Sequence, residues 1–313
     1  MAWLPFWPRD ASTTAATVDA IAVSEFILIG LVLLLVFGMM FTFVIKYRQG
    51  SKADRSHLVR KTWWFEIGWT SATLLAFLVL FAFGARAYLF LYQPPKADLE
   101  LYVVGKQWMW KVQYPGGQRE IDSLHLPLGK TVRVLLGSED VIHSFYIPAF
   151  RVKHDVVPGT YETFWFKPTE LGSFRLECSE FCGTGHANMI GTVHVLTPAD
   201  YTRWLSSQNA GQTLAQQGEA LFRRYGCSGC HSARSTIHAP LLEGVYGSYV
   251  HLADGRTVFA DERYIRDCIL LPASQRVAGY PPVMPSFTGQ IPEDGLMNLI
   301  AYVQSIGAAK ETP

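Results

Sequence analysis

The stretch Cys178-Ser-Glu-Phe-Cys-Gly-Thr-Gly-His-Ala-Asn-Met189 decides how the rest of the chain is interpreted. It places two cysteines four residues apart and follows them with a histidine and a methionine. Two thiolates at this spacing can bridge a pair of copper ions. His143 and His186 can each supply an imidazole, and the Met189 thioether or a backbone carbonyl can serve as a weak axial ligand. Because soft sulfur combined with imidazole selects copper, the stretch predicts a two-copper electron-transfer centre.

Two other interpretations of this loop remain open. Cysteines four residues apart could form a disulfide in an oxidising compartment, and a Cys2His2 set could hold zinc. Zinc has no use for the nearby Met189, however, and a structural zinc site does not explain why His143 arrives in a separate phrase, Asp140-Val-Ile-His-Ser-Phe145. An iron–sulfur cluster normally wants four cysteines, and only two are in reach. Copper is therefore the interpretation that uses every donor.

Four phrases of the sequence resemble subunit II of the haem–copper cytochrome c oxidases, the family that carries the dinuclear copper A centre. They fall within about the first 200 residues and read Gly105-Lys-Gln-Trp-Met-Trp110, Asp140-Val-Ile-His-Ser-Phe145, Val152-Lys-His-Asp-Val-Val-Pro-Gly159 and Cys178-Ser-Glu-Phe-Cys-Gly-x-x-His-x-x-Met189.

The resemblance implies a complete ligand set for the copper pair. In this numbering the ligands are the side chains of His143, Cys178, Cys182, His186 and Met189 and the backbone carbonyl of Glu180. The resemblance also implies that the Glu180 side chain helps to hold a magnesium or manganese ion at the contact with subunit I. It further implies that electrons enter the copper centre at Trp108.

Two long apolar runs near the N-terminus predict a membrane protein. Residues 26–44 and 67–85 contain no charged residue, and each run is close to the ~20 residues that a helix needs to cross the hydrocarbon core. We therefore expect an N-terminal segment at 1–96 that holds a hairpin of two transmembrane helices, at about 22–46 and 64–91.

The basic residues predict the orientation of this hairpin. Only Arg9 precedes the first run, whereas six basic residues lie between the two runs: Lys46, Arg48, Lys52, Arg55, Arg60 and Lys61. By the positive-inside rule the connecting loop is cytoplasmic. Both termini and the soluble domains should then lie on the periplasmic side of a bacterial inner membrane. The N-terminus has no basic n-region or small-residue cleavage site beside its apolar run, so a removed signal peptide is not favoured.

Glu66 stands at the cytoplasmic end of the second run, in Phe65-Glu-Ile-Gly-Trp-Thr70. A charged residue at a helix end is usually an interfacial side chain. The phrase is similar to the family pattern in which this glutamate lies at the mouth of a proton-uptake channel of subunit I. The family often has proline three residues after the threonine, and this chain has Thr73 there, so the local helix geometry can differ.

Residues 97–200 predict an all-β domain. Short runs of alternating aromatic and β-branched residues are broken by turn signals, and the resemblance makes this domain a cupredoxin-like Greek-key barrel with the copper ligands on loops at one end. The expected strands are 101–104, 108–112, 131–135, 163–166, 173–176 and 192–195.

A polar linker is expected at 201–212, and after it comes Cys227-Ser-Gly-Cys-His231. Cys-x-x-Cys-His is the attachment motif of c-type haem, in which Cys227 and Cys230 bind the haem vinyl groups and His231 ligates the iron. Taken alone, the motif is also compatible with a redox dithiol or half of a zinc site.

The surroundings of the motif favour haem. Helices are expected at 214–225 and 294–306, and Met284 lies between them as the distal ligand of a His/Met haem. This order resembles a class I cytochrome c domain, here all-α and covering 213–313. Met297 is read as a core residue of the last helix, and Cys268 as a small buried hydrophobe inside a further helix at 262–271.

The sequence as a whole predicts subunit II of a terminal cytochrome c oxidase with a fused cytochrome c domain. Electrons would pass from a donor, such as a soluble or membrane cytochrome c or a quinol-oxidising complex, through haem c and copper A to subunit I. Subunit I and further oxidase subunits would be its partners, and dioxygen reduction would be coupled to proton translocation. The alternatives are the electron-input subunit of a copper A nitric oxide reductase and a free-standing membrane-anchored carrier. A net charge of +1 argues against nucleic-acid binding.

Overall fold

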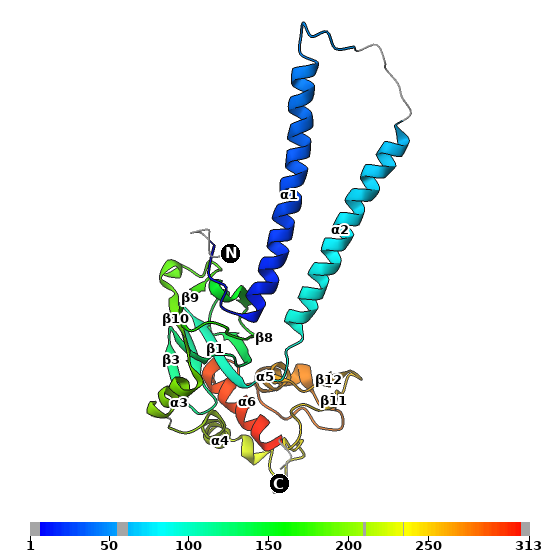
Figure 1. Ribbon diagram of the computed structural model, residues 1–313. Helices are drawn as coiled ribbons and strands as arrows, with labels where there is room; N and C mark the ends of the chain where they lie inside the picture. The colour runs from blue at the N-terminus through cyan, green and yellow to red at the C-terminus, as the bar shows by residue number, and fades with distance from the viewer. Residues whose placement is uncertain (1–6, 55–61, 209–210, 234, 308–313) are drawn as a thin grey trace. The chain divides into compact units, whose positions relative to one another are not determined.

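The computed structural model describes residues 7–54, 62–208, 211–233 and 235–307 (Figure 1). The chain divides into two compact units. One unit contains residues 13–94, and the other contains residues 1–12 together with 95–313. Of the basic residues assigned to the cytoplasmic loop, Arg55, Arg60 and Lys61 lie outside the described residues.

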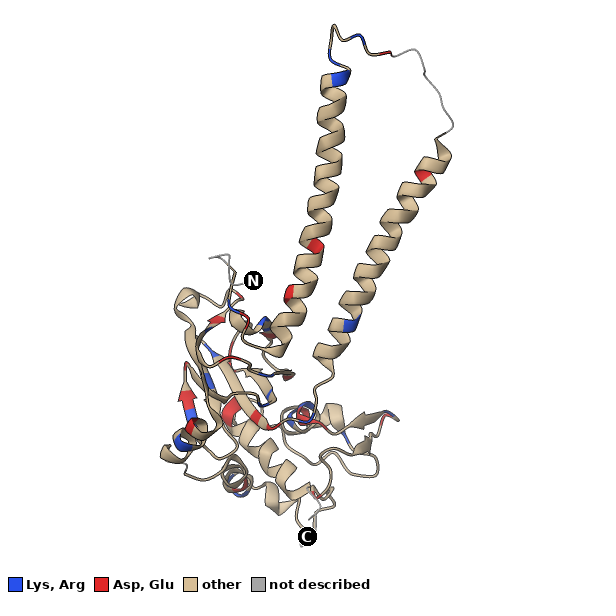
Figure 2. Ribbon diagram, viewed as in Figure 1, with Lys and Arg blue, Asp and Glu red and all other residues tan. Residues whose placement is uncertain are grey.

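The first unit consists of two long helices, α1 (Thr13–Lys46) and α2 (Trp63–Tyr92). Both are long and apolar enough to cross a membrane. Their large side chains are exposed on every side, as Leu34 and Phe81 illustrate at 74% and 72% exposure, and Figure 2 shows only a few charged residues along them. A helix that is apolar all round needs an apolar surrounding, so the two helices fit a membrane protein.

Helix α1 begins nine residues before the predicted start at residue 22. Its first part contains Thr14, Thr17 and Asp19, and Glu25 follows. A search for charge-free apolar runs finds only the central part of such a helix, because its polar first turns are still helical but are not hydrophobic. Helix α2 agrees with the predicted 64–91 within one residue at each end.

Ten strands between residues 99 and 196 form two five-stranded sheets. Their bounds are β1 (Leu99–Lys106), β2 (Met109–Gln113), β3 (Arg119–Ile121), β4 (Ser123–Pro127), β5 (Val132–Ser138), β6 (His143–Ile147), β7 (Val152–Val156), β8 (Glu162–Phe166), β9 (Gly172–Cys178) and β10 (Ile190–Leu196). The first sheet has the order β3-β2-β1-β5-β8 and the second β4-β10-β9-β6-β7. Strands β1 and β5, and β4 and β10, pair in parallel, and the other neighbours are antiparallel.

The two sheets enclose one hydrophobic core. Strand β1 shows how the sequence builds it, because Leu101 and Val103 point into the core between the sheets. Tyr102 and Val104, which alternate with them, are also buried but belong to a separate cluster on the outer face. The all-β class predicted for this region is confirmed as a β-sandwich.

Four of these strands were absent from the sequence prediction. Strand β3 has only three residues and β4 carries His125, which weakens their hydrophobic pattern. Strands β6 and β7 coincide with the phrases that contain His143 and His154. Their polar residues alternate with buried Phe145, Ile147 and Val156, so a period of two was present in both.

The predicted linker at 201–212 is partly helical. Helix α3 (Pro198–Ser207) is capped by Thr197, whose side-chain oxygen accepts a hydrogen bond from the Asp200 amide, and it has proline at its first position. Tyr201 is buried in the sandwich core. The sequence prediction missed this helix because the segment is polar overall and buries only one face of the helix.

The region after residue 212 contains α4 (Leu214–Arg224), α5 (Glu262–Leu270) and α6 (Glu293–Gly307). The prediction of an all-α region is wrong in one respect, since β11 (Tyr249–His251) and β12 (Thr257–Phe259) form a hairpin. The signal was the Asp254-Gly255 pair between the strands, because Gly255 adopts φ +90° at the turn. The described residues also include four short 3-10 helices: η1 (Pro148–Phe150), η2 (His186–Asn188), η3 (Cys227–Gly229) and η4 (Pro272–Gln275).

Helices α4 and α6 cross at very close range. A Cβ atom built on Gly218 would lie 1.9 Å from the carbonyl oxygen of Asn298, so only glycine allows the two backbones to approach. Next to the crossing, the rings of Phe222 and Tyr302 are 5.2 Å apart. This contact sets the position of the segment that follows α4, in which η3 begins at Cys227.

Candidate metal centre

The ligands predicted for copper come together at one end of the sandwich. His143 is the first residue of β6 and Cys178 the last residue of β9, and these antiparallel strands pair through Phe145 and Cys178. The loop after β9 carries Cys182 and His186 and returns through Met189 to β10. Its two ends are joined by the Cys178 amide, which donates to the Met189 carbonyl at 3.1 Å.

The donor atoms lie within a small volume. The Sγ atoms of Cys178 and Cys182 are 3.7 Å apart. The Cys178 sulfur lies 3.9 Å from His143 Nδ1, and the Cys182 sulfur lies 3.5 Å from His186 Nδ1 and 3.8 Å from Met189 Sδ. The sequence prediction thus named side chains that the fold brings together.

The donor cluster is buried, which distinguishes it from a pair of surface thiols. His143 and Met189 are fully buried, and Cys178 and Cys182 are nearly so. The ring of Trp110 contacts His143 edge-on at 5.9 Å. Gly105 lies against the same imidazole, since a Cβ atom at this position would be 3.0 Å from His143 Cδ2. A rigid wall of this kind holds the ligands in one geometry.

Asp140 orients the His143 ring, and the sequence analysis did not single it out. Its Oδ1 lies 2.8 Å from His143 Nε2, and its carboxylate also accepts the backbone N–H groups of Gln107 and Val141 at 2.7 Å each. The ring nitrogen that faces Cys178 is therefore Nδ1. A carboxylate on the second nitrogen is typical of metal-ligating histidines. In the sequence, the only sign of this role was an aspartate three residues before His143.

The electrostatics of the site favour one thiolate in the absence of metal. Burial raises the pKa of the Cys178 thiol, but hydrogen bonds to His143 and to the backbone groups of Ser144 and Glu180 outweigh it, so that the pKa is lowered. The pKa of Cys182 is raised by burial and by the neighbouring Cys178. A metal that binds both sulfurs must therefore displace the proton that this pair retains.

Glu180 offers two groups that point to different uses. Its backbone carbonyl lies 3.2 Å from the Cys178 sulfur, within the donor cluster. The residue as a whole is exposed, which leaves its carboxylate on the surface of the sandwich.

Trp108 lies in the turn between β1 and β2, over the ligand loop. Its Nε1 donates to the Cys182 carbonyl at 3.2 Å, next to Gln107 Nε2, which donates to the same oxygen at 2.8 Å. A Cβ atom on Gly185 would lie 2.4 Å from the indole, so glycine is needed for this approach. Trp108 is nevertheless 38% exposed, and it therefore links the surface to a ligand loop.

The donor set fits copper. It offers two sulfurs at bridging separation, one imidazole for each and two weak axial donors, a thioether and a carbonyl. Thiolate and imidazole together suit copper, and a long axial methionine or backbone oxygen is characteristic of copper electron-transfer sites. The thiols are free in this structure, at a sulfur separation well beyond the ~2.05 Å of a disulfide.

The second predicted site is built on the turn that follows α4. Cys227 begins η3, and the amides of Cys230 and His231 both donate to its carbonyl, at 3.2 and 2.9 Å. His231 Nδ1 lies 2.8 Å from the Pro240 carbonyl, which leaves Nε2 available to a metal. This arrangement fits covalent haem, with two free thiols and an oriented imidazole on one turn.

The remaining predicted residues lie elsewhere. Met284 is half-buried in the irregular segment before α6, whereas Met297 is fully buried in the core cluster that α6 shares with the first sheet. Glu66 is exposed on α2, where Thr62 Oγ1 donates to its carboxylate at 2.6 Å. Cys268 lies half-buried in α5.

Comparisons with known proteins agree with this centre. The family described as "Cytochrome C oxidase subunit II, periplasmic domain" matches residues 118–196. A cytochrome c oxidase subunit 2 of Alkalihalophilus pseudofirmus is 30% identical over 301 residues, which cover 90% of this chain and 84% of that protein. An alternative cytochrome c oxidase subunit 2 of Bradyrhizobium diazoefficiens is 28% identical over 255 residues, which cover 71% of this chain and 91% of that protein.

Among solved structures, the periplasmic domain of subunit II of cytochrome oxidase from Bradyrhizobium japonicum is similar at 34% sequence identity. It covers 37% of this chain and 96% of that domain, with a TM-score of 0.36. The match to the Alkalihalophilus protein extends over most of both chains and includes the region of the ligand loop. The chain therefore belongs to the family of cytochrome c oxidase subunit II.

Proposed function

We propose that this subunit delivers electrons to its oxidase through two centres of its own, a dinuclear copper site on the sandwich and a covalent haem on the C-terminal region. An electron-input role in a haem–copper oxidase that contains subunit I follows from the family. The observation that carries the proposal is the pair of buried sulfurs 3.7 Å apart with an imidazole beside each. The domains would be 1–96, 97–200 and 213–313.

The copper pair would be held by His143, Cys178, Cys182, His186 and Met189 and by the Glu180 carbonyl. When bound, copper supplies a centre that takes up and releases single electrons. The protein's part is to hold the ligands still. Asp140 fixes one imidazole, and the Cys178 amide is bonded to Met189, so that little has to move when the charge of the site changes.

The haem would be attached through Cys227 and Cys230, with His231 as the proximal ligand. The Pro240 carbonyl 2.8 Å from Nδ1 supports this role, because it fixes the tautomer in which Nε2 can bind iron. Haem in this position supplies a one-electron donor on the same chain as the copper ligands.

Met284 is proposed as the distal haem ligand. Met284→Ala should abolish the near-infrared sulfur-to-iron band of the ferric protein and lower its reduction potential, because a thioether ligand favours ferrous iron. Met297→Ala is the matched control. Met297 is fully buried, so its loss should cost about 2–5 kcal/mol of stability but leave the band in place. A band that survives in Met284→Ala and disappears in Met297→Ala would show that the assignment is wrong.

Three further roles complete the proposal. Trp108, half-exposed and bonded to the ligand loop, would be where electrons enter the copper centre from the surface. The exposed Glu180 carboxylate would bind a magnesium or manganese ion shared with subunit I. Glu66 would lie at a proton-uptake channel of subunit I, in a chain with both termini on the periplasmic side of a bacterial inner membrane.

The acceptor can be tested on the native complex. Purified with its partner subunits and supplied with a reduced cytochrome c, the complex should consume dioxygen and acidify the outer medium of sealed vesicles. The rate should fall when the oxygen-reducing subunit is inhibited by cyanide. Consumption of nitric oxide, with no oxygen uptake, would instead assign the chain to a copper A nitric oxide reductase.

A further inference from the structure

The C-terminal module, defined as residues 213–307, is packed against the outer face of the first sheet. Four residues of this face, Tyr102, Val104, Leu135 and Tyr161, belong to one hydrophobic cluster with residues of the module. The module contributes Leu214, Leu252, Ala260, Tyr264, Ile265, Met297, Ile300, Ala301 and Val303. Strands β1 and β5 therefore carry apolar residues on both faces, which is typical of a sheet covered on both sides.

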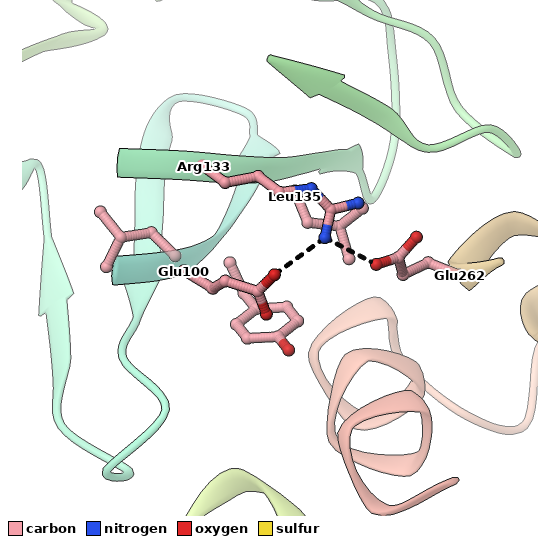
Figure 3. A pocket seen from close by; sticks show the side chains of 6 residues that line it. Glu100, Arg133, Leu135 and Glu262 are labelled. Atoms are coloured by element: carbon pink, nitrogen blue, oxygen red, sulfur yellow. Dashed lines mark hydrogen bonds and ion pairs between the residues drawn. The ribbon is translucent and has the colours of Figure 1, made fainter. Parts of the chain in front are cut away.

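Polar groups fix the orientation of the module at two places. Arg133 on β5 lies 3.0 Å from Glu262 of α5 and 2.9 Å from Glu100 of β1, as Figure 3 shows. Four residues further along α5, Arg266 Nη1 donates to the Gly159 carbonyl at 2.6 Å and its Nε donates to Glu293 at 2.9 Å. Arg266 and Glu262 are both 5% exposed, so these charges are held in place by partners on both modules.

The junction between the modules is also bound to the sheet. A Cβ atom on Gly117 would lie 2.2 Å from the Gln212 carbonyl oxygen, so the chain passes directly over this turn. Arg119 Nη2 donates to Gln217 of α4 at 2.6 Å. A flexible tether would have no such contacts just before its domain.

Helix α6 connects this interface to a copper ligand. Met297 packs on Gly137, where an added Cβ would lie 3.3 Å from Met297 Cε. Gly137 pairs with Val104 across β1 and β5, and the next residue, Gly105, lies against the His143 ring. On the other side of α6, Leu296 and Leu299 share a cluster with Cys227.

We propose that the C-terminal module is a permanent third layer of the copper domain, with α6 packed between the haem turn and the strands β1 and β5, of which β1 carries Gly105 against His143. The electron step rests on the proposed function, whereas the docking does not. In that step the haem iron goes from ferrous to ferric and the copper pair gains one electron, with no bond made or broken. The fixed layer lets this transfer proceed without a search by a tethered domain and keeps it first-order even after the linker is cut.

The test cuts the tether and asks what remains bound. A specific protease site placed between Gln208 and Gly211 of the full-length, detergent-solubilised chain is cleaved, and the product is passed through gel filtration at about micromolar concentration. A module held only by its tether has a roughly millimolar effective concentration and separates after the cut. A docked module co-elutes, which corresponds to a Kd at or below about 1 µM.

Two substitutions on the same sheet sharpen the result. Leu135→Asp places a carboxylate in the covered face and should release the cut module, whereas Ile121→Asp, on an exposed residue of β3, should not. Gly137→Leu, which would push against Tyr161 and Met297, should act like Leu135→Asp. Release of the cut wild-type module, or retention in both disruptive variants, overturns the proposal. A copper spectrum that persists in the variants shows that the sandwich is folded.

A second measurement separates docking from electron transfer. After photochemical reduction of the haem, the rate of haem oxidation in the cut wild type should stay independent of protein concentration and of added glycerol. In cut Leu135→Asp it should become proportional to concentration. A chain that binds neither haem nor copper would defeat the proposed function, while the elution profile would still decide the docking. A viscosity-dependent rate in the uncut wild type would overturn the fixed contact.

Discussion

Replacing Cys182 by serine should remove the electronic coupling of the two coppers. Cys182 contributes the sulfur that faces Cys178, His186 and Met189, so the substitution would remove a proposed bridging ligand rather than an outer support. Loss of a group that only orients a metal ligand costs about 10–100-fold in affinity or activity. The loss from a bridging ligand should be at least as large, and turnover of the oxidase should fall accordingly.

Electron paramagnetic resonance gives the direct measurement. The oxidised wild-type chain should show one unpaired electron shared equally by two coppers, and Cys182→Ser should show a localised cupric signal with less copper bound. Cys268→Ser is the matched control, because Cys268 lies half-buried in α5 and should leave both the spectrum and the copper content unchanged. About one copper per wild-type chain, with the signal of an isolated cupric ion, would refute the dinuclear centre.

Loss of Cys227 and Cys230, the cysteines proposed to attach haem, should have the second largest effect. Cys227→Ala combined with Cys230→Ala should abolish covalent haem, while the copper spectrum stays intact because the copper ligands lie on another module. Turnover with the native donor should then fall steeply, since the proposed haem donor on the same chain is gone. Denaturing gels stained for haem, copper spectra and oxygen uptake together measure these three results.

Cys268→Ala again serves as the control for that double variant, and it should retain haem and turnover. Full turnover with the native donor in the haem-free variant would mean that the module is an accessory, and that electrons reach the copper ligands from outside, through Trp108. Loss of the copper signal in the same variant would mean that the module supports the folding of the sandwich, which the proteolysis experiment would reveal independently.

The proximity of the side chains proposed to bind copper was predictable because these residues are chemically unusual as a set and close in sequence. Cys178, Cys182, His186 and Met189 fall within twelve residues, and no structural role needs that set. His143 was found through its own phrase. Asp140 was missed because a carboxylate three residues before a histidine is common, and only its bond to Nε2 and to two backbone amides distinguishes it.

The arrangement of the modules was not predictable from local patterns. The segment at 201–212 is polar and reads as a linker, yet its first part is helical and its last residue, Gln212, lies against Gly117. The signal in the sequence was strand β1, where four consecutive residues, Leu101–Val104, have apolar or aromatic side chains. All four are buried, so neither face of the strand is exposed to water. That pattern states that a second layer exists but not which segment supplies it, because the partner is more than one hundred residues away.

The Gly218 contact between α4 and α6 was similarly invisible. Glycine inside a helix lowers helical propensity. The reason for glycine at position 218 is seen only in the folded structure, where the Asn298 carbonyl of a distant helix lies beside it.

The apolar outer face of β1 and β5 also determines what the sandwich would expose without the C-terminal module. A domain that is joined to its neighbour only by a linker can be removed without exposing apolar surface on the neighbour. Here Tyr102, Val104 and Leu135 would be left bare by such a loss, and a bare sheet face of this kind invites aggregation. Removing the C-terminal module from this chain would therefore expose apolar side chains that the sandwich alone cannot cover.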